Sequence, residues 1–304
     1  MDLTIVIPSY NRKALLRHTL NSIKRSPVAG VPIVVVDNAS TDGTAEFLES
    51  YCSQNPDVTS VFEPNRNAAA ARNRGLSMVS TRWVYFFDSD DEFEDIPHEW
   101  DSKAQMVAFP TRQMVENKVS RRAFYGTPDP AIHILNGMLS TQSMIFRTSW
   151  LREIGGWNPA CLVWNDWELG ARALMANPSI DWITDRAYHT IKVHPDSLTG
   201  PNFRSRYKPQ LDTIRQVLDD IRDTDTLTAT RCRKALMLRT YILSGKLLHE
   251  GEQNGSTLCR TFIDESFGAR PDGWILGRIL EQYTAMGGRG AWRLAIWRMK
   301  RKSV

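Results

Sequence analysis

The N-terminal third of the chain alternates short apolar runs with segments of helical periodicity. Four runs rich in β-branched and aromatic residues predict buried strands at residues 3–8, 32–36, 58–62 and 83–87. Between them, apolar side chains recur at helical spacing around residues 16–23, 45–52 and 68–79. Consecutive strands joined by helices lie parallel, with the crossing helices on both faces of the sheet. The pattern predicts an α/β protein with a parallel, doubly wound sheet.

Composition narrows the class further. The chain has 304 residues, enough for one large α/β domain or two smaller ones, and 42% hydrophobic and 24% charged residues are typical of a globular protein. We find no apolar run of membrane-spanning length and no signal segment at the start, so we expect a cytoplasmic protein. The four cysteines lie far apart without CxxC spacing, which predicts a structural role for each. The net charge of +4 is mild, and we expect no nucleic-acid partner.

The C-terminal end is basic and carries tryptophans. Six basic residues and no acidic one occur from residue 289 onward. On a helix, Trp292, Ala295, Ile296 and Met299 would share one face, while Trp297 falls off it. Two interpretations stay open: a peripheral contact with the inner face of a membrane, or a helix packed on the body with a solvated basic end.

Three acids follow the fourth predicted strand within four residues. Asp88, Asp90 and Asp91 end the run WVYFFDSDD. Ligands of parallel sheets bind at the carboxyl ends of the strands, and carboxylates are the ligands that hard divalent cations prefer. The alternative is an ordinary acidic turn in water. The rest of the chain favours the metal site.

Polar and aromatic residues follow the other strands and should meet at the same edge. Tyr10 offers a stacking ring, Asp37 a carboxylate for a base or ribose, and Arg72 a cation. With the acids, these are the parts of a nucleotide diphosphate site. Neither GxxxxGK[ST] nor a GxGxxG after the first strand is present, so we expect a metal to neutralise the phosphates.

Four segments in register, IVIPSYNR, VVVDNASTDGT, NRNAAAARNRG and FFDSDD, resemble the N-terminal half of the family 2 glycosyltransferases. These are inverting enzymes of the GT-A fold that use nucleotide sugars. The resemblance implies a Rossmann-like mixed sheet, mostly parallel, with helices on both faces. It also implies that Pro8 and Tyr10 line a base pocket, that Asp37 contacts the nucleobase and that Arg72 lies near base and phosphates.

The resemblance also assigns roles to the acids. It implies that Asp88 and Ser89 bind the nucleotide and that Asp88, Asp90 and Asp91 hold Mn²⁺ or Mg²⁺ on the diphosphate. Among the three acids, we expect Asp90 to be the most direct ligand. In some members a histidine completes the metal shell or contacts the diphosphate, and His194 stands at the matching place. His189 is the alternative.

The segment from Thr141 to Leu174 resembles the acceptor region of the family. The usual Glu-Asp pair reads Asn165-Asp166 here, so we assign the general base to Asp166, with Glu168 as second candidate. Helix capping is the alternative role of Asp166. We expect the acceptor to be bound by four residues: Trp164, Asn165, Trp167 and Glu168. Core packing explains the tryptophans equally well.

Together these observations predict a metal-dependent, inverting glycosyltransferase. It would move a sugar from a nucleotide diphosphate, most simply a UDP-sugar, to a hydroxyl of a glycan or lipid-linked glycan in bacterial surface polysaccharide synthesis. A polyprenyl-phosphate acceptor and a catalytically silent nucleotide-sugar-binding scaffold are the alternatives. We expect residues 1–105 to bind the nucleotide sugar, residues 106–200 the acceptor, and residues 201–304 to form a helical extension.

Overall fold

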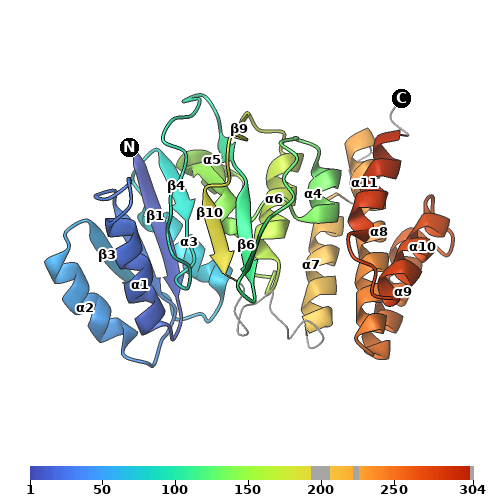
Figure 1. Cartoon of the computed structure of the whole chain (residues 1–304), viewed down its shortest axis with the longest axis horizontal. Helices are drawn as coiled ribbons and strands as arrows, with labels where there is room; N and C mark the ends of the chain where they lie inside the picture. Colours follow the sequence, from blue (N-terminus) through green and yellow to red (C-terminus); the bar gives the residue numbers. More distant parts are fainter. Residues whose placement is uncertain (193–205, 222–225, 302–304) are drawn as a thin grey trace.

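The structure is a computed structural model that describes residues 1–192, 206–221 and 226–301. An α/β body carries a group of helices at one end, where the C-terminal part of the chain lies (Figure 1). His194 falls outside the described residues.

The main sheet contains the four predicted strands side by side. Its order is β3-β2-β1-β4-β8-β5-β9. The strands are β1 (Leu3–Ser9), β2 (Ile33–Asp37), β3 (Val58–Phe62), β4 (Trp83–Phe86), β5 (Met106–Ala108), β8 (Met144–Arg147) and β9 (Ile180–Trp182). The first four are parallel, and β8 runs antiparallel to both of its neighbours, β4 and β5. The α/β class and the mixed, mostly parallel sheet are therefore confirmed.

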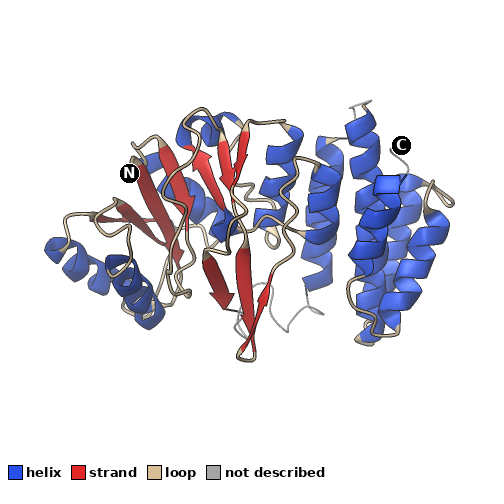
Figure 2. Ribbon diagram, turned by 45° about the horizontal axis from the view of Figure 1, so that its top comes forward, coloured by secondary structure: helices blue, strands red, loops and turns tan. Residues whose placement is uncertain are grey.

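Helices cover both faces of this sheet, as Figure 2 shows. Side chains of α1 (Lys13–Lys24) and α2 (Thr44–Gln54) share one apolar cluster with one face of the strands. Those of α3 (Ala68–Met78), α5 (Thr148–Glu153) and α6 (Asn165–Met175) share a second cluster with the other face. Strands buried on both faces explain why the sequence runs are continuously apolar and do not alternate with polar residues.

A glycine brings α3 unusually close to the sheet. A Cβ at Gly75 would lie 2.3 Å from Cγ1 of Val6 and 3.1 Å from Cγ2 of Val36, so only glycine fits there without a shift. The approach presses α3 onto β1 and β2. It thereby places Arg72, one turn earlier on the helix, at the carboxyl edge of the strands.

A second, smaller sheet borders that edge. Its order is β10-β6-β7, formed by β6 (Thr111–Val115), β7 (Lys118–Arg121) and β10 (His189–Lys192). Strands β10 and β6 are parallel, and β7 is antiparallel to β6. The short helix α4 (Pro130–Asn136) follows, capped by the carboxylate of Asp129 at its start and by Gly137 at its end. A turn of 3₁₀ helix, η1 (Thr141–Ser143), leads into β8.

The C-terminal helices are α7 (Tyr207–Asp220), α8 (Leu227–His249), α9 (Gln253–Phe267), α10 (Trp274–Ala285) and α11 (Ala291–Arg301). Their apolar side chains share one core with α4 and with Trp167 and Ala171 of α6. The extension is thus packed onto the α/β body through the same helix that carries the candidate base.

The C-terminal basic segment forms α11, and it is packed on the body. Ala295, Ile296 and Met299 are buried, whereas Leu294 and Trp297 are exposed, which is the face predicted from the sequence. The packing agrees with the second of the two interpretations. Within the described ranges, we find no helix both long and apolar enough to span a lipid bilayer.

Candidate active site

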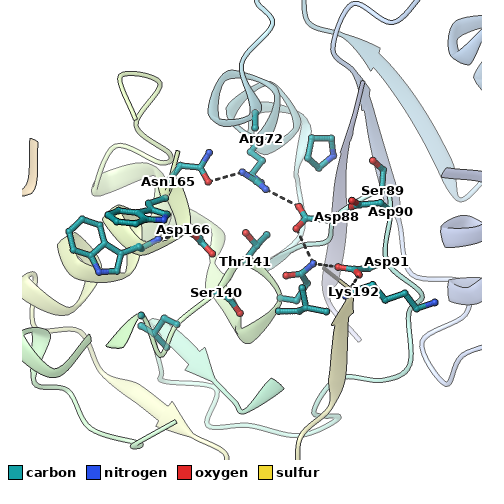
Figure 3. A pocket seen from close by; sticks show the side chains of 18 of the residues that line it. Arg72, Asp88, Ser89, Asp90, Asp91, Ser140, Thr141, Asn165, Asp166 and Lys192 are labelled. Atoms are coloured by element: carbon teal, nitrogen blue, oxygen red, sulfur yellow. Dashed lines mark hydrogen bonds and ion pairs between the residues drawn. The ribbon is translucent and has the colours of Figure 1, made fainter. Parts of the chain in front are cut away.

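A cavity of about 670 Å³ lies at the carboxyl edge of the strands, between the two halves of the α/β body (Figure 3). Eleven of the predicted site residues line it: Pro8, Tyr10, Arg72, Asp88, Ser89, Asp90, Asp91, Trp164, Asn165, Asp166 and Trp167. Asp37 and Glu168 do not line it. The residues predicted for the nucleotide and for the acceptor are thereby brought to a single cavity.

A chain of hydrogen bonds crosses the cavity from one half to the other (Figure 3). Arg72 donates to the side-chain oxygen of Asn165 at 3.1 Å and pairs with Asp88 at 2.8 Å. Gln142 then donates to both Asp88 and Asp91, at 2.9 and 2.7 Å. Asn165 is neutral, so among the described residues Asp88 is the one carboxylate that pairs with this arginine. Because asparagine stands at position 165, where the family usually has an acid, the positive charge of Arg72 is not shared with an acid there and acts on Asp88.

The three acids lie in different environments. Asp90 pairs with Arg12 at 2.7 Å, and Asp91 is buried and accepts from the backbone N–H of Lys192 at 2.8 Å. Burial, and next the charge of Asp88, raise the pKa of Asp91 to about 8. The carboxylates therefore crowd one another, and an added cation would relieve that repulsion.

These residues fit a divalent cation in chemistry, since hard cations prefer carboxylate oxygens. The arrangement is nevertheless incomplete. Within residues 1–192, 206–221 and 226–301, no three carboxylate, imidazole or thiol side chains converge as metal ligands would. The predicted fourth ligand, His194, lies outside those ranges. A metal held by Asp90, Asp88, Asp91 and His194 thus stays a prediction.

An exposed aromatic ring forms part of the cavity wall that the N-terminal half of the chain contributes. Tyr10 is 40% exposed, and the guanidinium of Arg66 lies 5.3 Å from its ring centre. Both line the cavity. Asp37 instead turns inward and accepts from the backbone N–H of Ser40 at 3.1 Å, which is the turn-closing role that aspartate commonly plays. Its neighbour Asn38 lines the cavity in its place.

Asp166 lies on the opposite wall, in the first turn of α6 (Figure 3). Its carboxylate accepts from the backbone N–H of Trp167 at 2.9 Å. The helix dipole stabilises a carboxylate at this position, and the second oxygen has no partner in the described residues. Asp166 therefore meets the geometric requirements of both a helix-start acid and a base facing the cavity.

Glu168 and the two tryptophans have mainly structural surroundings. Glu168 is fully buried and pairs with Arg172 at 2.6 Å, on the side of α6 away from the cavity. Trp167 is 3% exposed and donates to the carbonyl of Ile134 at 3.1 Å. Trp164 is half-buried and has a left-handed backbone with φ of 55°, which is rare for a bulky residue. Of the three, only the tryptophans reach the cavity.

His189, the alternative to His194, lies inside the core. It is fully buried, and its ring packs edge-on against Phe87 at 4.7 Å. Neither ring nitrogen has a hydrogen-bond partner among the residues that the structure describes. Burial, and next the charge of Arg112, lower its pKa to about 3. The residue does not line the cavity.

The buried, neutral His189 predicts a loss of stability in mild acid. An unfolded histidine has a pKa of about 6.5, so below that pH the unfolded chain takes up a proton that the folded chain refuses. Stability is therefore lost as pH falls from 6.5 toward 3. Between about pH 7 and pH 5.5, the parent protein should lose more unfolding free energy than the His189→Leu variant. We expect the two losses to differ by about 1 kcal/mol. Urea unfolding at both pH values measures it, and an unchanged difference would contradict the assignment.

Among the lining residues that were not predicted from the sequence are four cations and one amide: Arg12, Arg122, Lys192, Arg239 and Gln142. Arg12 is the last residue of IVIPSYNR, and Gln142 lies in the segment directly before β8. Their positions in predicted motifs could have identified them as site residues. Arg122 and Arg239 belong to no motif. They reach the cavity only through the packing of β7 and α8.

The residues predicted to bind a nucleotide lie at the carboxyl edge of the strands, with Asp166 across the same cavity, as expected for an α/β protein that binds its ligand at this edge. Residues 4–98 match the family described as Glycosyl transferase family 2, the family that the motifs of this segment resemble. Among curated relatives, glycosyltransferase GlyA of Streptococcus pneumoniae is 35% identical over 92 residues, 30% of this chain and 13% of that protein. Putative teichuronic acid biosynthesis glycosyltransferase TuaG of Bacillus subtilis is 34% identical over 92 residues, 30% and 36% of the two chains.

Solved structures resemble the whole chain. S. aureus TarS 1–349 in complex with UDP-GlcNAc has a TM-score of 0.70 at 19% identity, over 96% of this chain and 90% of that one. Mannosyltransferase PcManGT from Pyrobaculum calidifontis, in complex with GDP-Man and Mn²⁺, has a TM-score of 0.58 at 16% identity, over 94% and 83%. The predicted GT-A fold is confirmed by this likeness. The chain spans about a third or less of the two curated relatives above.

Proposed function

We propose that the protein is an inverting glycosyltransferase that moves a sugar from a UDP-sugar to a hydroxyl of an acceptor. The observation that carries the proposal is the single cavity in which Asp166 faces the acid edge across the Arg72 hydrogen-bond chain. Inversion needs one carboxylate to take the proton of the accepting hydroxyl on the side opposite the leaving diphosphate. The two walls of the cavity supply these two sides.

The residues of the first half would bind the donor. The base would stack on Tyr10 beside Arg66, and Arg72 and Arg12 would lie near the developing charge of the diphosphate. A divalent cation at Asp90, with Asp88 and His194, would neutralise the leaving diphosphate. Asp37 would support the base pocket from behind through its bond to Ser40.

Residues of the second half would position the acceptor. Asp166 would accept the hydroxyl proton, and Trp164 would border the acceptor. The nature of the relatives supports an acceptor of the bacterial cell surface, since TuaG is named for teichuronic acid biosynthesis. We place the protein in surface polysaccharide synthesis on that ground.

Titration of UDP by calorimetry, with and without Mn²⁺, followed by measurement of UDP release from UDP-sugars, tests the proposal. We expect UDP binding that requires Mn²⁺ and slow release of UDP from one sugar donor, faster with acceptor. Failure to bind UDP in either condition would refute the proposal. Binding without turnover on any acceptor would favour the scaffold alternative.

A further inference from the structure

Two arginines that no motif predicts lie around the candidate base. Arg122, which follows β7, and Arg239, from the middle of α8, both line the cavity. Burial lowers the pKa of both guanidinium groups, and the negative charge of Asp166 acts on both and opposes this lowering. Both cations are therefore close to the wall where the accepting hydroxyl would lie.

The fold holds both side chains in place. One nitrogen of Arg122 donates to the carbonyl of Gly137 at 3.1 Å, and one nitrogen of Arg239 donates to that of Ile134 at 2.9 Å. These carbonyls belong to the C-terminal end of α4, where cations are favoured. Such capping occupies one nitrogen of each guanidinium and leaves the other donors unused among the described residues.

Arg239 is further fixed between two aromatic rings. Its guanidinium carbon lies 4.4 Å from the ring centre of Trp164 and 4.6 Å from that of Trp167. Stacking of this kind orients the planar group. It also gives a reason for the left-handed backbone of Trp164, which places the ring on the arginine. The two rings and the carbonyl of Ile134 thus hold the guanidinium of Arg239 from three sides.

The two cations are not balanced by the residues around them. In the described part of the chain, neither forms an ion pair, and Asp166 is the one negative charge that acts on both of them. Nε of Arg239 is buried and has no hydrogen-bond partner within residues 1–192, 206–221 and 226–301. Burial lowers the pKa of Arg239 to about 10. Buried charges and unmatched donors are costly, and an anionic ligand would offset that cost.

The guanidinium group matches phosphate and carboxylate oxygens with two parallel hydrogen bonds. The position beside Asp166, across the cavity from Asp90, indicates the acceptor and not the donor diphosphate. We propose that Arg122 and Arg239 form a subsite for a negatively charged group, phosphate or carboxylate, carried by the acceptor next to its accepting hydroxyl. The inference rests on the proposed function and specifies its acceptor class.

Binding of matched pairs of small probes tests the subsite. The pairs are glycerol 3-phosphate with glycerol, and methyl glucuronide with methyl glucoside, each titrated into the full chain by calorimetry with and without UDP and Mn²⁺. We expect one anionic probe to bind about 10- to 100-fold more tightly than its neutral partner. Which pair shows the preference tells phosphate from carboxylate.

Arginine variants locate the preference. Arg239→Gln and Arg122→Gln should each reduce it to within a few-fold while the affinity for UDP stays unchanged, and Arg239→Lys should keep part of it. Arg233→Gln is the matched control, because Arg233 lies on the same helix and donates to the carbonyl of Ile221. Thermal melting verifies that each variant is folded.

Three results would overturn the subsite. These are equal binding of charged and neutral probes, no binding of either, or a preference that survives both glutamine substitutions. A preference that disappears in Arg72→Met and not in Arg239→Gln would assign the anion to the donor side, which also refutes the proposal. Loss of UDP binding by the unaltered protein would instead refute the proposed function, and the titrations without UDP still decide the subsite.

Discussion

Replacing Asp166 with asparagine should lower the turnover of the protein by about 10²- to 10⁴-fold, the range that general-base catalysis contributes. Asparagine has nearly the same shape and can still accept from the N–H of Trp167, so the start of α6 should be kept. It cannot take a proton from a hydroxyl. We therefore expect kcat to fall while the affinity for UDP, measured by calorimetry, stays the same.

Glu168→Gln is the informative control for this variant. Glu168 was the second candidate for the base, and the structure places it in a buried pair with Arg172. We expect that substitution to lower the melting temperature and to leave kcat of the folded protein nearly unchanged. Full turnover of Asp166→Asn would exclude the general base and favour a polyprenyl-phosphate acceptor, which needs none. A loss of kcat confined to Glu168→Gln would transfer the role to that residue.

Replacing Arg72 with methionine should have the second large effect. The side chain is buried and holds Asp88 and Asn165, one on each half of the body, so its loss leaves a carboxylate without its cation and interrupts the hydrogen-bond chain. Breaking such a pair costs about 2 kcal/mol of stability, after allowance for the partial exposure of Asp88. The loss of a charge beside the diphosphate should lower kcat/KM by about 10²-fold.

Arg74→Met provides the matched control, because Arg74 lies on the same helix and is exposed. We expect a change in unfolding free energy within about 0.5 kcal/mol for it. Urea unfolding and the rate of UDP release give both quantities. If Arg72→Met unfolds at the same urea concentration as the parent and keeps its kcat/KM, the hydrogen-bond chain has no part in joining the two halves.

The donor side of the site could be predicted from the sequence because its residues follow strands directly. The carboxyl ends of β1 and β4 must meet at one edge once the sheet is parallel, so Tyr10 and Asp90 come together without knowledge of side-chain packing. Asp37 shows the limit of this reasoning. It ends β2 as expected, but a local bond to Ser40 turns its carboxylate away from the cavity.

The acceptor side could be predicted only in part. Asp166 was found because it stands in a motif at a helix start, and Glu168 was included because it is near in sequence. One helix places these two acids on different faces, the first toward the cavity and the second toward Arg172. Arg239 could not be found at all, since its position depends on how α8 packs against α4 and α6.

The shared core of α4, α6 and the C-terminal helices has a consequence for how the protein is made. Strands β1 to β4 leave the ribosome first and lie next to one another in the sheet. The edge that is predicted to bind the nucleotide can therefore form from the first part of the chain. The wall that holds Asp166 is completed only after α8 has emerged, because Trp167 and Ala171 of α6 pack against the C-terminal helices. During synthesis, a nascent chain able to hold nucleotide would thus precede one able to position an acceptor.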